Sequence, residues 1–137
     1  MNRFKDEKSI LKLIEDYKEP FERINYFAQL LSDKVILGMP HEMTEAMAEL
    51  ASIFVSLNEI TYEAETAHIN EEDRLSERKR GDRASKENYT SYEIEVERIA
   101  LLRRIRNIFR ERRESCEKLI SVIQSLLRIV DKEKFIA

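Results

Sequence analysis

A chain of 137 residues predicts one domain, and its 42% apolar content is sufficient for a hydrophobic core. Two glycines and two prolines are too few for the turns of an all-β fold, whereas 37% charged residues is typical of long amphipathic helices. The single cysteine excludes a disulfide framework and a zinc site built from cysteines. Because no apolar run opens the chain, we expect a soluble cytoplasmic protein without a signal peptide or a membrane span.

The formal net charge of −3 conceals an uneven division. Residues 1–73 carry 7 basic and 16 acidic side chains, while residues 74–137 carry 17 and 11. The two parts therefore have net charges of −9 and +6. This asymmetry predicts either an acidic arm that folds on a basic one or two surfaces that meet different partners.

Residues 1–38 are predicted to form the N-terminal helices, since their apolar side chains recur at spacings of three and four. Pro20 interrupts this pattern. Proline lacks an amide donor and disfavours helical geometry in the residue before it, so we expect a break or kink at Glu19. Pro20 itself then lies in the first turn of the second helical piece.

Gly38 is predicted to take a left-handed conformation at a helix end, and Pro40 to open the next helix. Residues 40–79 then form one long helix, because their apolar side chains alternate at spacings of four and three with no further glycine or proline. In residues 70–90 Leu75 is the only large aliphatic residue among many charges. This segment is predicted to be a mobile basic polar connection, helical only at its start.

Residues 91–132 are predicted to form a long C-terminal helix. Thr90 and Glu93 fit a capping box, in which each side chain satisfies a free backbone amide near the other. The helix is about 60 Å long at about 1.5 Å per residue, which exceeds what a compact domain of this size requires. One face of this helix carries a seam of residues that alternate strictly at spacings of three and four: Leu102, Ile105, Phe109, Arg112, Cys116, Leu119, Ile123, Leu126 and Val130.

The end of this helix is apolar on more than one side. Ile120, Val122, Leu127 and Ile129 add to the seam there. Such a helix needs further cover, so we expect a homo-oligomer, with burial by the N-terminal helices as the alternative. The predicted oligomer interface is Leu119, Ile123, Leu126 and Val130. The predicted fold is one all-α domain over residues 1–137: a long antiparallel helical hairpin, coiled-coil-like, with a kinked N-terminal helical segment.

No catalytic, metal-binding or cofactor-binding residues are predicted, and we expect the protein not to be an enzyme. Neither His41 nor His68 has a nucleophile at a suitable spacing. Glu65 and His68 have the spacing of di-iron helical bundles, but such sites need the motif twice. Glu42 and Glu45 resemble one of the carboxylate pairs by which helical pyrophosphohydrolases hold magnesium, but the second acidic pair of those enzymes is absent. No glycine-rich phosphate loop is present.

The most distinctive feature of the sequence is its basic residues. Between Arg98 and Arg113 there are seven arginines against one acid, Glu111. Four of them follow spacings of three, four and three and so form a single stripe: Arg103, Arg106, Arg110 and Arg113. The preceding connection adds a second group with nearby tyrosines: Arg78, Lys79, Arg80, Arg83, Lys86, Tyr89 and Tyr92.

These two groups predict a nucleic-acid interface. Arginine neutralises phosphates and releases counterions, while tyrosine stacks on exposed bases, a combination that suits single strands. We therefore expect a non-enzymatic, single-stranded DNA-binding accessory protein of recombination or replication. Two alternatives stay open. The arginines pair with the acidic part of the chain, or the chain is a phage-type helical interaction module, an inhibitor or adaptor, that docks on an acidic protein partner.

The order of short helix, long helix, charged connection and long C-terminal helix resembles the UvsY-type phage recombination mediators. The segments that carry the resemblance are Lys86-Glu-Asn-Tyr89, Tyr92-Glu-Ile-Glu-Val96 and Ile120-Ser-Val-Ile-Gln124-Ser-Leu-Leu-Arg128. The resemblance implies a ring-like oligomer in the host cell cytoplasm that binds single-stranded DNA. It also implies partners, a RecA-type recombinase and a single-strand binding protein, and DNA contacts at Arg78, Lys79 and Arg80.

Overall fold

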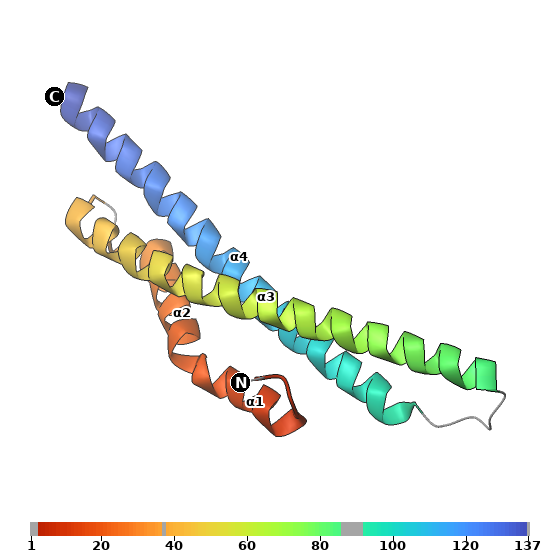
Figure 1. Cartoon of the computed structure of the whole chain (residues 1–137). Helices are drawn as coiled ribbons and strands as arrows, with labels where there is room; N and C mark the ends of the chain where they lie inside the picture. The colour runs from red at the N-terminus through yellow and green to blue at the C-terminus, as the bar shows by residue number, and fades with distance from the viewer. Residues whose placement is uncertain (1–2, 37, 86–91, 137) are drawn as a thin grey trace.

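A computed structural model describes residues 3–36, 38–85 and 92–136. These residues form four α-helices and no strand, which confirms the predicted all-α class. The helices are α1 (Glu7–Asp16), α2 (Lys18–Ser32), α3 (Pro40–Ser85) and α4 (Glu93–Ile136). The long helices α3 and α4 pack along each other, α1 and α2 lie against them, and the end of α4 draws away from the start of α3 (Figure 1). Within the described ranges, no helix is both long and apolar enough to cross a membrane.

The N-terminal helices meet at Tyr17. Asp6 caps α1, because its carboxylate accepts a 2.8 Å hydrogen bond from the Ser9 amide, and this bond lowers the pKa of Asp6. The break between α1 and α2 lies two residues before the predicted position, Glu19. Proline clashes with the carbonyl four residues before it, which here is the last residue of α1. Pro20 lies in the first turn of α2, as predicted.

The end of α2 differs from the prediction in its position. Lys34 takes a left-handed conformation with φ 59°, and the amide of Val35 donates to the Leu30 carbonyl at 3.0 Å. This is a Schellman cap in which lysine takes the place that glycine usually fills. Gly38 does have the predicted positive φ, 79°, but it lies in the turn before α3. Pro40 opens α3, as predicted.

The long helix predicted over residues 40–79 continues as α3 to Ser85, so the predicted polar connection is wrong for residues 80–85, which are helical. Contacts with α4 explain the difference. Leu75 is half-buried and lines the same surface hollow as Ile99, and Arg78 forms an ion pair with Glu95. These tertiary contacts stabilise a stretch whose composition alone resembles a polar linker. Residues 86–91, with Thr90 of the predicted capping box, lie outside the described residues.

The core follows the predicted seams of both long helices. Each seam contributes fully or almost fully buried side chains, among them Leu50, Leu57, Ala64, Leu102, Ile105, Phe109, Cys116 and Ile123. The Cys116 thiol donates to the Leu50 carbonyl at 3.1 Å, and burial raises the pKa of Cys116 to about 11. The ring of Phe109 lies 5.1 Å from that of Tyr17 and 5.8 Å from that of Phe21, centroid to centroid. These rings join the N-terminal helices to α4.

The predicted oligomer interface is used inside the chain. Ile123 is fully buried, which corrects its assignment to an intermolecular surface, while Leu119, Leu126 and Val130 are partly buried against the core. The same core cluster contains Phe27 of α2, Ile36 of the turn that follows it and Met43 of α3. Burial within the chain was the alternative that the sequence left open. On this stretch, Val122 and Ile129 remain about half exposed.

Candidate nucleic-acid interface

The four predicted stripe arginines form one row on α4, and every one contacts α3. We call Arg103, Arg106, Arg110 and Arg113 the arginine row. Arg110 donates to the Glu65 carboxylate at 2.8 Å, and Arg113 donates to the Asn58 amide oxygen at 3.3 Å. Arg106 lies 3.2 Å from Nδ1 of His68, and Arg103 lies 3.7 Å from the Glu72 carboxylate. Arginines that come later in α4 contact residues that come earlier in α3.

These contacts match the alternative in which the basic arm pairs with the acidic one. They do not bury the row, since the side chains of Arg103 and Arg110 are 54% and 40% exposed. A guanidinium has five N–H donors, and each ion pair here uses one nitrogen. Exposed ion pairs contribute about 0–1 kcal/mol. A phosphate can therefore meet the remaining donors without the loss of a large stabilising interaction.

His68 is the buried member of this set of contacts. Its Nδ1 faces Arg106, and its Nε2 lies 2.8 Å from the Glu72 carboxylate at an angle outside hydrogen-bonding geometry. Burial lowers the pKa of His68, Glu72 opposes that shift, and Arg106 and Arg103 add to it. Glu65 and His68, whose spacing resembles a metal motif, thus both face arginines. Over the described ranges, no group of three or more metal-ligating side chains occurs.

The basic end of α3 holds the second predicted group. Arg78 pairs with Glu95, and the charged groups of Arg78 and Lys79 lie 5.4 and 5.3 Å from the centre of the Tyr92 ring. The Tyr92 hydroxyl donates to Asp82. Tyr92 is thus held by contacts within the chain, which differs from its predicted role as a free base-stacking surface.

The other members of the second group fall into two classes. Arg80 and Arg83 are exposed on the last turns of α3. Lys86 and Tyr89 lie outside the described residues. The structure therefore brings Arg78, Lys79 and Tyr92 together and leaves Arg80 and Arg83 directed to solvent.

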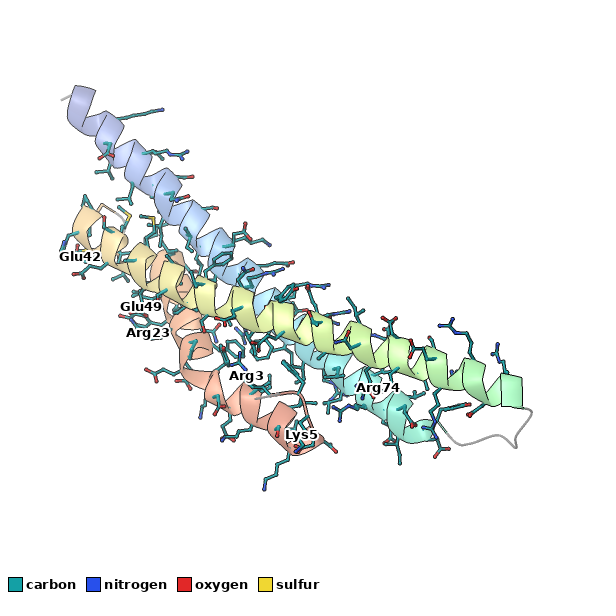
Figure 2. The ribbon with its side chains drawn as sticks, in the orientation of Figure 1. Arg3, Lys5, Arg23, Glu42, Glu49 and Arg74 are labelled. Atoms are coloured by element: carbon teal, nitrogen blue, oxygen red, sulfur yellow. The ribbon has the colours of Figure 1, made fainter. Side chains whose placement is uncertain are left out.

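A further basic cluster is not indicated by the sequence. Arg3, Lys5, Arg74 and Arg98 line a hollow of about 460 Å³ between the N-terminal segment, α3 and α4 (Figure 2). Arg3 donates to Glu63, a residue 60 positions away. No local pattern near Arg3 or Lys5 indicates this arrangement, because tertiary packing alone creates it.

Comparison with known proteins gave no match, neither with a protein-family model nor with a curated protein or a solved structure.

Proposed function

We propose that the chain is a non-enzymatic, single-stranded DNA-binding accessory protein of recombination or replication. The unit that contacts DNA is an antiparallel hairpin of α3 and α4, and the arginine row is its main contact surface. The observation that supports this most is the continuity of the row: four arginines on one side of one helix, two of them with exposed fractions of 54% and 40%. Arg80 and Arg83 extend the basic surface along α3.

Phosphate contact makes binding depend on salt. Each phosphate neutralised on a single strand contributes about 0.7 to the slope of log affinity against log salt concentration. Four arginines, if each meets one phosphate, contribute about 2 to 3. Replacement of all four residues of the arginine row with glutamine is therefore expected to weaken binding and to flatten the salt dependence by that amount.

The measurement is fluorescence anisotropy of a labelled single-stranded oligonucleotide, titrated at several salt concentrations beside a duplex control. Arg23→Gln is a matched control for Arg110→Gln. Arg23 pairs with Glu49, and its side chain is also 40% exposed, but it lies on α2. We expect Arg110→Gln to weaken binding several-fold and Arg23→Gln to leave it unchanged. Equal effects of the two variants, or an unchanged salt slope in the fourfold variant, would contradict the proposal.

The proposal includes self-association and, from the resemblance to recombination mediators, partners such as a recombinase. Val122 and Ile129 on α4 are 47% and 52% exposed, and they supply the apolar surface for contact between copies. Light scattering after size-exclusion chromatography measures the oligomer. A monomer at all concentrations would remove this part of the proposal and leave the DNA contact to be tested by itself.

A second candidate function is docking on an acidic protein. It is favoured by the observation that Arg103 and Arg110 already bind carboxylates, those of Glu72 and Glu65. A protein partner would be retained on a column of the immobilised chain after nuclease treatment, whereas nucleic acid would not. Binding of such a partner with no affinity for single strands at low salt would favour this function over the first.

A further inference from the structure

The hollow beside the N-terminal segment has a wall that is largely fixed. Arg3 donates from Nε to the Glu63 carboxylate at 3.1 Å. Arg98 donates from Nη2 to the Phe4 carbonyl at 2.6 Å and lies 3.5 Å from the Glu71 carboxylate. These contacts hold two guanidinium groups in place before any ligand arrives, and preorganised donors bind at a lower entropic cost.

The mouth of the hollow carries two more cations. Lys5 is exposed, and the side chain of Arg74 is 74% exposed, with a 3.4 Å contact to Glu71 (Figure 2). Neither side chain is held as firmly as those of the wall. Both reach solvent at the mouth, where an entering anion would meet them.

The charge of the lining suits one kind of anion. Four cations, Arg3, Lys5, Arg74 and Arg98, face two carboxylates, Glu63 and Glu71, so the lining has a net charge of +2. A phosphate monoester carries about −1.5 to −2 at neutral pH, whereas an internal phosphate diester carries a single charge. Charge complementarity therefore favours the monoester. The volume, about 460 Å³, is that of a site for a small ligand.

An aromatic ring lies beside the cations. Tyr62 lines the hollow from α3, and 70% of it is exposed, which leaves its ring accessible. Aromatic rings of this kind stack on nucleic-acid bases with little sequence preference. We propose that the hollow binds a phosphate monoester with a base attached: a nucleotide, either free or at the phosphorylated end of a strand. The strand-end form rests on the proposed function, and the free-nucleotide form does not.

The first experiment tests the site with small probes. Isothermal titration calorimetry of the full chain compares thymidine 5′-monophosphate with thymidine and with inorganic phosphate. We expect the monophosphate to bind at least tenfold more tightly than either, because only it engages both the cations and Tyr62. A double Lys5→Gln, Arg74→Gln variant is expected to weaken that binding at least tenfold. Tyr62→Ala is expected to reduce the monophosphate to the affinity of inorganic phosphate.

The matched control is a double Lys12→Gln, Arg128→Gln variant. It removes the same charge from exposed positions that do not line the hollow and do not belong to the proposed DNA-binding surface. It is expected to leave the affinity for the monophosphate unchanged. An equal loss in the two double variants would overturn the proposal, as would monophosphate binding no tighter than that of thymidine.

The second experiment separates the two sources of the ligand. It compares oligonucleotides of one sequence with a 5′-phosphate, a 3′-phosphate or hydroxyl ends. Tighter binding of a phosphorylated end, lost in the Lys5→Gln, Arg74→Gln variant, assigns the site to strand ends. Equal binding of all three, with the monophosphate still bound, assigns it to the free nucleotide. If the proposed function fails because the fourfold arginine-row variant binds strands normally, the thymidine monophosphate result still tests the hollow.

Discussion

At the scale of single residues, the ionisation of His68 is linked to folding. It is 4% exposed and lies where α3 meets the arginine row. Its neighbours are Glu72, which favours the protonated ring, and Arg103 and Arg106, which oppose it. Burial is the largest cause of its lowered pKa, so the neutral ring is the form that the fold accommodates.

The pH dependence of stability follows from this lowered pKa. The unfolded chain has a histidine pKa near 6.5 and binds the proton more readily than the folded chain. The free energy of unfolding is therefore expected to fall as the pH drops through about 6.5, and to be fully retained above about 7.5. Urea denaturation followed by circular dichroism between pH 7.5 and 5.5 measures this effect. His68→Gln is expected to flatten the profile, while a profile identical to that of the original chain would refute the assignment.

At the scale of elements, the two glycines offer a matched pair. Gly81 lies inside α3 and Gly38 in the turn before it, and a Cβ added to either meets nothing within 4 Å. The two sites therefore differ in backbone conformation and not in the room available for a side chain. Gly38 has a φ of 79°, which L-residues adopt only at a cost, while Gly81 is helical.

Alanine is expected to have opposite effects at these two positions. Gly81→Ala should raise the free energy of unfolding by about 0.5–1 kcal/mol, because alanine loses less backbone entropy in a helix. Gly38→Ala should lower it by about 1–2 kcal/mol, because a left-handed alanine is strained. Urea denaturation of both variants measures the difference. No gain from Gly81→Ala would indicate that the last turns of α3 are not helical in solution.

At the scale of the whole molecule, one aromatic cluster joins the two halves of the fold. Phe109 of α4 is fully buried between Tyr17 and Phe21. The guanidinium of Arg112, the one polar member of the predicted seam, lies 5.1 Å from the centre of the Phe21 ring and donates to Asn25 at 2.9 Å. An arginine in an apolar seam is thus accommodated by a ring and an amide of α2.

Loss of the central ring is expected to be costly. Phe109→Ala should lower the free energy of unfolding by about 3–5 kcal/mol through lost burial and the cavity that remains. Hydrogen exchange should then show faster exchange in α1 and α2, which this cluster attaches to α4. Ile94→Ala is a suitable control, because Ile94 is 79% exposed and its loss should change stability by less than about 0.5 kcal/mol. Equal effects at the two positions would contradict the role of the cluster.

The sequence predicts the parts of this fold that depend on local periodicity. Residues such as Leu102, Ile105 and Phe109 repeat at helical spacing, so their burial follows from the pattern alone. The continuation of α3 through residues 80–85 does not follow from the sequence, because this polar end of the helix depends on contacts with α4, which composition does not reveal. The end of α2 was misplaced because a lysine, Lys34, takes the left-handed cap.

The candidate sites follow the same division. The spacing of the arginine row is visible in the sequence. The partners of its members are not, because they lie far away along the chain: 38 positions separate Arg106 from His68, and 55 positions separate Arg113 from Asn58. The sequence does not indicate the hollow beside the N-terminal segment. Its cations come from three separate segments, among them Arg3, Arg74 and Arg98, and only packing brings them together.

The ion pairs between α3 and α4 also define how the two helices align. Arg103 and Arg110 are seven positions apart, and so are their partners Glu72 and Glu65. Sliding one helix past the other by about two turns would set Arg110 opposite Glu72, but it would also set Arg103 opposite Lys79 and Glu117 opposite Glu65. The ring of Phe109 has no equivalent seven positions away, where Leu102 and Cys116 stand. Charge and aromatic packing therefore both oppose a slipped alignment of the hairpin.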